Sequence, residues 1–175
     1  LSVRLQQGAS RSGWQVRLAY NDVLSAQLEL AADNRFEAGT LAINQPLRLR
    51  PGEPGLFIDA RLDEADPSIW QQALQAQAES FAGPGDASNS NASNLDTTGA
   101  SWEWLREVNL SGRRWSYLGQ QWTNPDIQIQ RGEEAWLITL AAAQVAGRIS
   151  QPFNPEEPIF TDLDFLALPG RDDEV

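Results

Sequence analysis

The sequence predicts a mainly β protein with one helix, arranged as an antiparallel curved sheet or β-groove made of repeated strand units. Apolar and polar residues alternate with a period of two through most of the chain, as in Trp14-Gln-Val-Arg-Leu18. Only residues 67–80 combine a helix-start signal with a long stretch of apolar residues at helical spacing. A string of short apolar segments between Trp136 and Pro169 also has an echo near the N-terminus.

Alternation predicts four strands before the helix, each with one apolar and one more polar face. They are expected at 14–19, 24–31, 41–50 and 56–62. Pro46 interrupts the third strand and marks an edge, a bend or a bulge there. The connections between these strands are short, so antiparallel neighbours are expected.

The helix is expected at 67–80. Asp66 suits the N-cap and Pro67 the first helical position. Acidic residues at 63 and 64 complement the helix dipole without any further role. One side of this helix is expected to seal one end or face of the sheet. Its residues recur near helical spacing and are Ile69, Trp70, Ala73, Leu74, Gln77 and Phe81.

Residues 82–100 are small and polar and are expected to form a mobile loop. A short helical turn follows from Ser101, and the acidic end 171–175 is expected to fray. Between them the strands resume at 108–110, 115–118, 127–129, 136–140, 145–149 and 159–168.

The echo lies 122 residues before the C-terminal string and predicts a recurring β unit of roughly that length. The matched pairs are Trp14/Trp136, Val16/Ile138, Leu18/Leu140, Val23/Val145, Leu41/Leu163 and Ile43/Phe165.

Composition indicates one β-rich fragment, residues 1–175, of a larger protein. The net charge of −11 disfavours nucleic-acid binding. The chain has no Cys, His or Met, so it lacks disulfides, the commonest general base and the commonest transition-metal ligand. No apolar run reaches 18 residues, so membrane contact is expected only through regions outside this fragment.

The strongest catalytic candidates are Asp162 and Asp164, which flank Leu163 and would share one strand face. Paired carboxylates can perform acid–base chemistry or bind a hard cation. A solvated strand face explains them without any special role and is the preferred interpretation. No phosphate-binding loop and no Gly-x-Ser-x-Gly motif occurs. We therefore expect no enzyme activity, no catalytic residue, no metal and no cofactor.

The seven tryptophans have two interpretations. They can stack on sugars or lie on a lipid-facing surface, or they can fill the core of a thin sheet. The apolar pattern around Trp70 and Trp136 favours the core, whereas Trp102, Trp104 and Trp122 are expected to be partly exposed. Exposed tryptophans leave open an alternative function, a β-sandwich binding module for carbohydrate or protein.

The C-terminal third resembles the AsmA-like envelope proteins of Gram-negative bacteria, specifically the YhdP family. The resemblance extends over about residues 56–169, without the loop, and includes the strand-then-helix segment 56–74. The matching strings are L-S-G-R-R-W-S-Y-L-G (110–119), I-Q-I-Q-R (127–131), W-L-I-T-L (136–140), V-A-G-R-I (145–149), Pro152 and L-D-F-L-A-L-P (163–169).

The resemblance implies a long periplasmic protein, tethered to the inner membrane by an N-terminal helix, whose β units stack into a groove with an apolar interior. It also implies phospholipid acyl chains as the ligand and a role in lipid transfer and the outer-membrane permeability barrier. The residues expected to face lipid are Trp14, Val16, Leu18, Trp136, Ile138, Leu140, Leu163 and Phe165.

Overall fold

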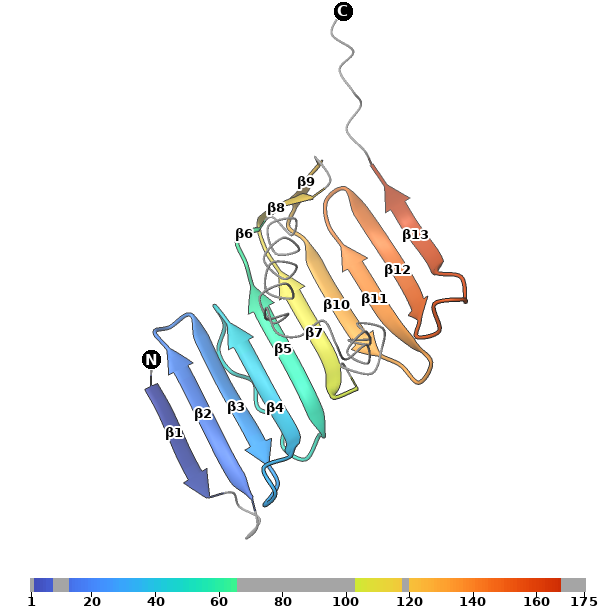
Figure 1. The fold of residues 1–175 in the computed structure, drawn as a ribbon. Coiled ribbons are helices and arrows are strands. Elements are labelled where there is room, and N and C mark those ends of the chain that lie inside the picture. Colours follow the sequence, from blue (N-terminus) through green and yellow to red (C-terminus); the bar gives the residue numbers. More distant parts are fainter. Residues whose placement is uncertain (1, 8–12, 66–102, 118–119, 168–175) are drawn as a thin grey trace, which may run out of the picture.

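The regular elements of the protein are all β-strands in the residues that the computed structural model describes, 2–7, 13–65, 103–117 and 120–167 (Figure 1). The mainly β class expected from the alternation is therefore confirmed. The helix expected at 67–80 and the loop at 82–100 lie outside the described residues. The strands are β1 (Ser2–Gln7), β2 (Trp14–Tyr20), β3 (Leu24–Leu30), β4 (Phe36–Ile43), β5 (Gly55–Arg61), β6 (Glu64–Ala65), β7 (Leu105–Ser111), β8 (Arg114–Tyr117), β9 (Gln120–Thr123), β10 (Asp126–Arg131), β11 (Ala135–Ala141), β12 (Val145–Pro152) and β13 (Phe160–Leu166).

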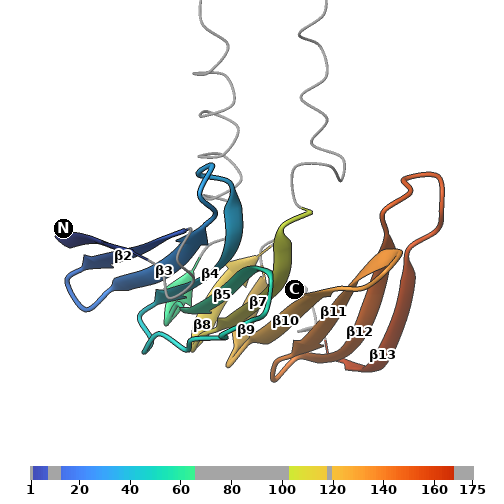
Figure 2. The same ribbon diagram turned by 90° about the horizontal axis from the view of Figure 1, so that it is seen from below.

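Ten strands form one open sheet in the order β1-β2-β3-β4-β5-β7-β10-β11-β12-β13. β1 and β13 are its two edges and lie on opposite sides of the molecule (Figure 1). Viewed from below, the sheet runs from β2 to β13 as one layer and does not close on itself (Figure 2). The close contacts between described strands join neighbours within a sheet, so these strands do not pack into a sandwich.

The expected antiparallel arrangement is right at both ends of the sheet and wrong at its centre. β1 to β4 are antiparallel, and so are β7 and β10 to β13. The pairs β4–β5 and β5–β7 are parallel. A parallel neighbour requires a connection long enough to return the chain to the same end of the sheet. Residues 44–54 provide one such connection, and residues 62–104 provide the other.

The first of these connections replaces the second half of an expected strand. Alternation predicted a strand over 41–50, but β4 ends at Ile43. Asn44 has a positive φ of 52°, and Pro46 cannot donate a hydrogen bond to a neighbouring strand. The chain therefore leaves the sheet here, and the apolar residues Leu47 and Leu49 belong to the connection.

A small second sheet, in the order β6-β8-β9, lies beside the large one. The buried Trp115 of β8 anchors it, because its indole Nε1 donates a hydrogen bond of 2.7 Å to the Leu62 carbonyl oxygen. Gly112 lies against the same indole, where a Cβ atom would collide with the ring and with the Leu62 carbonyl. The absence of a side chain at Gly112 thus allows the small sheet to approach the end of β5.

The predicted 122-residue repeat is not confirmed. Two of the matched pairs occupy different environments. Val23 lies in the turn after β2 and is 45% exposed, whereas Val145 begins β12 and is buried. Ile43 is the last residue of β4, whereas Phe165 lies within β13, just after an irregularity in the β12–β13 pairing. What the two ends of the sheet share is the strand pattern of an antiparallel meander.

Candidate functional site

Strand pairing divides the large sheet into two faces, because residues paired between neighbouring strands lie on the same face. We define the apolar face by two rows of paired residues that run from β2 to β13. The first row is Leu18, Ala26, Leu41, Ile58, Val108, Ile129, Ile138, Ile149 and Thr161. The second row is Tyr20, Leu24, Ile43, Ala60, Leu110, Ile127, Leu140, Gly147 and Leu163.

The apolar face is only half-buried along most of its length. Ile58, Val108, Ile129 and Ile138 all keep partial solvent exposure although each lies between paired neighbours. At one end Leu163 is 41% exposed. Core side chains beneath a second layer would be almost fully inaccessible. This surface is therefore a broad apolar strip of the kind found at binding sites.

Seven of the eight residues expected to face lipid lie on the apolar face. On β2, the residues on this face are Trp14, Val16 and Leu18. On β11, they are Trp136, Ile138 and Leu140. Leu163 pairs with Gly147 and joins the second row. The two clusters lie near opposite ends of the sheet, and the strands between them complete the rows.

Phe165 is the exception. It pairs with Ala146, whereas Leu163 pairs with Gly147, so the register shifts by one residue between them. Asp164 is the additional residue at this β-bulge. The pairing places Phe165 with Ala146 and Ala141, opposite the face that carries Leu163. Simple alternation along 163–165 could not detect this inserted residue.

The central part of the apolar face was missing from the expected set. Leu41, Ile58, Val108, Ile127 and Ile129 join the two terminal clusters into continuous rows. Their alternation was visible in the sequence. The sequence did not show that these residues share one face, because this depends on which strands are neighbours and on the parallel pairs around β5.

Trp136 is partly covered at its end of the apolar face. Its ring meets Phe153 edge to face, with ring centroids 5.9 Å apart. The Arg131 guanidinium lies 4.3 Å from the Phe153 ring centroid and 5.4 Å from that of Trp136. These contacts fix Trp136 near the start of β11, whereas Trp14 on β2 remains 46% exposed.

The opposite, polar face contains the more deeply buried centre. The connection 44–54 lies against it, and the Arg50 guanidinium is 4.5 Å from the centre of the Phe57 ring. Phe57 is 6% exposed and Asp59 is 4% exposed. Gln27, Thr40 and Ala42 are also buried on this face. Burial on the polar face thus follows the path of the connection, and Ala26 and Ala60 are buried in the apolar rows on the other side.

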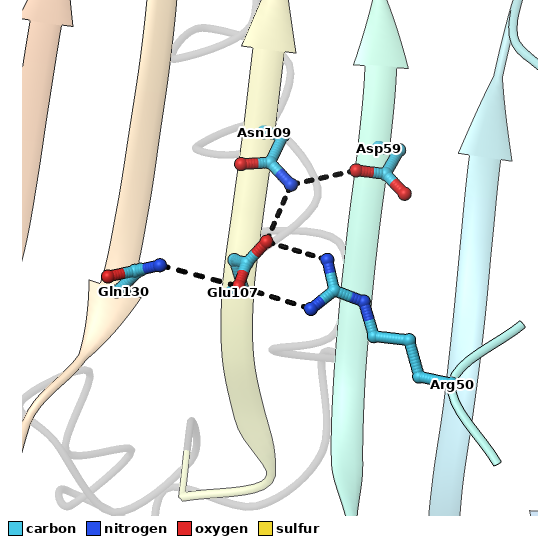
Figure 3. A network of polar contacts seen from close by, with 5 residues as sticks. All are labelled: Arg50, Asp59, Glu107, Asn109 and Gln130. Atoms are coloured by element: carbon cyan, nitrogen blue, oxygen red, sulfur yellow. Dashed lines mark hydrogen bonds and ion pairs between the residues drawn. The ribbon is translucent and has the colours of Figure 1, made fainter. Parts of the chain in front are cut away.

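A network of polar contacts joins the connection to three strands on this face (Figure 3). Arg50 donates two hydrogen bonds to the Glu107 carboxylate, Nη2 to Oε1 at 2.7 Å and Nη1 to Oε2 at 3.3 Å. Asn109 Nδ2 donates to Glu107 Oε1 at 2.7 Å and to Asp59 Oδ1 at 2.8 Å. Gln130 Nε2 completes the network with a longer contact of 3.5 Å to Glu107 Oε2.

The network sets the ionisation of its two charged groups. Burial raises the pKa of Glu107, but the hydrogen bonds from Arg50 and Asn109 outweigh burial, and the pKa is lowered. For Arg50, burial lowers the pKa, and the contact with Glu107 outweighs it, so the pKa is raised. Both groups are therefore held in their charged forms, as expected for a bidentate ion pair.

The two carboxylates weighed as catalytic candidates do not share a strand face as predicted. Asp162 pairs with Arg148 on the polar face, and Asp164 is the extra residue of the bulge. Asp162 borders a shallow depression of about 730 Å³ over β10 to β13, and Asp164 does not line it. Within the described ranges, no group of three or more His, Cys, Asp or Glu residues could hold a metal ion.

The described tryptophans are dispersed over the molecule. Trp104 is 42% exposed and packs edge to face against Phe36 at 5.9 Å. Trp115 is buried, and Trp122 is half-buried in the small sheet. Trp70 and Trp102 lie outside the described residues. In the part of the chain described by the structure, tryptophans do not line up as a single stacking platform of the kind that a sugar-binding module uses.

No protein-family model, no curated protein and no solved structure matches this chain. Among the described residues, none belongs to a helix with the length and apolar character needed to cross a membrane. The sheet geometry therefore provides the structural basis for the functional proposal.

Proposed function

We propose that this chain is a non-enzymatic segment of a periplasmic envelope protein that carries phospholipid, with its apolar face in contact with the acyl chains. The observation that carries the proposal is the pair of apolar rows, unbroken from Leu18 to Ile149 and from Leu24 to Leu140. In the first of these rows every residue between Leu18 and Ile149 is aliphatic.

The dimensions of the rows suit this ligand. Nine strands at a spacing of about 4.8 Å make each row about 38 Å long. One leaflet contributes about half of a hydrocarbon core that is about 30 Å thick. An extended acyl chain can therefore lie along a row, across the strands, with apolar contacts over its whole length. Away from the connection, the opposite face exposes polar side chains such as Arg17, Gln130 and Arg148, which suits an aqueous compartment.

The resemblance to the YhdP family supports the same proposal and adds its cellular setting. In that setting the segment belongs to a protein tethered to the inner membrane, contributes to the outer-membrane permeability barrier, and touches membranes only through other regions. An acyl chain bound along the apolar face would bury its half-buried side chains further. This burial is favourable because it releases the water that covers them.

The direct test is lipid binding by the purified protein. Mass spectrometry of an organic extract is expected to find co-purified phospholipid. After delipidation, a phospholipid with brominated acyl chains is expected to quench tryptophan fluorescence, since Trp14 is exposed on the apolar face. A folded protein that neither retains phospholipid nor shows quenching at any vesicle concentration contradicts the proposal.

A matched pair of substitutions localises the binding surface. Ile138→Asp places a charge in the first apolar row, and Thr139→Asp places the same charge on the polar face one residue later. Leu163→Asp repeats the first change at an exposed position. We expect lipid binding to fall at least about tenfold in Ile138→Asp and Leu163→Asp, because a charge cannot enter an apolar contact without a large penalty. Equal effects of all three variants would place binding elsewhere.

A further inference from the structure

The row of paired residues next to the first apolar row changes character along the sheet. Over β2 to β5 this row is apolar and consists of Val16, Leu28, Gly39 and Leu56. Over β10 to β12 it consists of Arg131, Trp136 and Gln151. The apolar face therefore has a polar boundary on these three strands, beside the residues of the first row, which are Ile129, Ile138 and Ile149.

Arg131 is the unusual member of this boundary. Its pairing with Trp136 places it on the apolar face. In the part of the large sheet that the structure describes, the other arginines at paired positions all lie on the polar face, and they are Arg4, Arg17, Arg61 and Arg148. A charged side chain beside apolar residues is costly unless a partner compensates its charge. Strand alternation alone therefore does not explain a cation at this position.

Two aromatic rings hold the Arg131 guanidinium in place. Its centre lies 4.3 Å from the Phe153 ring centroid and 5.4 Å from that of Trp136, and the side chain is half-buried. Stacking uses the faces of the planar guanidinium, whereas its N–H donors lie in the plane. This planar set of donors matches the oxygen atoms of a phosphate group. Arg131 is thus oriented in advance as a donor to an anion at the edge of the apolar face.

The position of Arg131 also suits a lipid that lies along the apolar rows. Arg131 follows Ile129 by two residues on the same strand face, which is about 7 Å along β10. From β11 to β2 the rows cross six strand steps of about 4.8 Å, or about 29 Å. One leaflet of acyl chains needs only about 15 Å, half of a hydrocarbon core. An acyl chain that begins beside Arg131 can therefore extend along the first row toward β2.

We propose that Arg131, held by Trp136 and Phe153, binds the phosphate of the phospholipid headgroup and thereby sets the direction in which the lipid lies on the sheet. This inference rests on the proposed lipid function and adds a headgroup site to it. Trp136 contributes an indole N–H, the polar group that lets tryptophan lie where an apolar surface meets water. The headgroup is then at the β10–β12 boundary, and the acyl chains cover the aliphatic rows.

Two lipids with the same brominated acyl chains test the headgroup site. One is phosphatidylcholine and the other is diacylglycerol, which lacks the phosphate, each in the same neutral detergent micelles with delipidated protein. Phosphatidylcholine is chosen because its headgroup has no net charge for the exposed Glu133 and Glu134 of the β10–β11 turn to repel. From quenching of tryptophan fluorescence, we expect about tenfold tighter binding of phosphatidylcholine, because charge-assisted hydrogen bonds to phosphate are strong.

A matched pair of variants assigns this preference to one arginine. Arg131→Gln should reduce the preference to about twofold or less and leave the affinity for diacylglycerol nearly unchanged, because it removes only the charged donor. Arg148→Gln makes the same change on the polar face of β12 and should keep the full preference. Circular dichroism verifies that both variants keep their strands. Loss of the preference in both variants, or in neither, would overturn the assignment to Arg131.

The unchanged protein provides a test that does not depend on the folding of a variant. Phosphatidylcholine should protect Arg131 from phenylglyoxal, an arginine reagent, more than diacylglycerol does, as mapped by peptide mass spectrometry. Equal protection by the two lipids would contradict the headgroup site.

Two further results separate this inference from the proposed lipid function and from a site for free phosphate. Equal affinity of the unchanged protein for both lipids would remove the headgroup site and leave lipid binding intact, whereas binding of neither lipid would contradict the lipid function itself. Glycerophosphocholine, the same headgroup without acyl chains, is expected to compete only weakly. Competition as strong as that of phosphatidylcholine would mean a site for soluble phosphate esters and would overturn the proposal.

Discussion

The two faces of the large sheet differ in which side chains they bury. The apolar face carries two aliphatic rows and remains half-exposed. The polar face carries Gln27, Thr40 and Asp59, and these are buried beneath the connection 44–54. Most half-exposed sheets bury the apolar face and hydrate the polar one.

The two faces are therefore expected to contribute differently to the stability of the fold. Deeply buried groups contribute most to stability, and the connection gathers several of them on the polar face around Phe57 and Asp59. An exposed apolar strip gains stability from burial only when something else covers it. The apolar face is the surface that we propose for lipid, and the connection buries the centre of the polar face.

The strongest test of this comparison is a pair of truncations. Phe57→Ala, on the polar face, should reduce the free energy of unfolding by about 3–4 kcal/mol, because it removes a buried ring. Ile138→Ala, on the apolar face, should reduce it by about 1 kcal/mol, because this side chain is half-exposed. Urea denaturation measures both. Equal losses would mean that the apolar face is a packed core.

The next largest effect is expected from Arg50→Ala. It leaves the Glu107 carboxylate buried without its bidentate partner and should cost about 2 kcal/mol. Arg35→Ala is the matched control, since its ion pair with Asp33 is mostly exposed and should contribute less than about 1 kcal/mol. Chemical denaturation of both variants provides the comparison. A loss of unfolding free energy no larger than that of Arg35→Ala would show that the network does not stabilise the fold.

A smaller, local effect is expected from Gly147→Ala in the second apolar row. The new Cβ would collide with the Asp162 carbonyl oxygen and with Leu163. We expect a cost of about 1–2 kcal/mol and a looser β13. Amide hydrogen exchange should increase in β13 and remain unchanged in β2. If amide exchange in β13 is the same in the variant and the parent protein, the close approach at Gly147 is not required for the β12–β13 pairing.

The smallest effect is a pH dependence from the polar face. Because the folded-state pKa of Glu107 is lowered from 4.5, its stabilising contribution is present above that value. It should be lost as the pH falls below 4.5 through the folded-state pKa. Glu107→Gln should therefore flatten the acid side of the stability–pH curve, measured by urea denaturation at each pH. A variant curve parallel to that of the parent protein would assign the acid sensitivity to other groups.

Local patterns in the sequence predicted much of the fold. Alternation located segments such as 14–19, 136–140 and 145–149 within strands, because each residue's parity determines which side of its own strand it occupies. It failed at 44–50, where Asn44 and Pro46 end the strand, and at the bulge after Leu163. At both places one residue changes the backbone path while the apolar pattern continues.

The sequence predicted separate parts of the candidate site but not how they join. The β2 and β11 clusters were identified from alternation, but their membership of one face depends on every pairing between them. The Arg50–Glu107 ion pair left no signal in the sequence, since its partners are 57 residues apart. Charged residues at such separation form a site only when a connection and a strand are brought together.

The sequence by itself determined the class of the protein and the two-sided character of each strand, because side-chain alternation is a local property of extended backbone. Tertiary structure alone decided the strand order, the two parallel steps around β5 and the path of residues 44–54. These features depend on long-range hydrogen bonding and on which face a connection covers. They decide that the connection buries the centre of the polar face and that most residues of the two apolar rows are only half-buried.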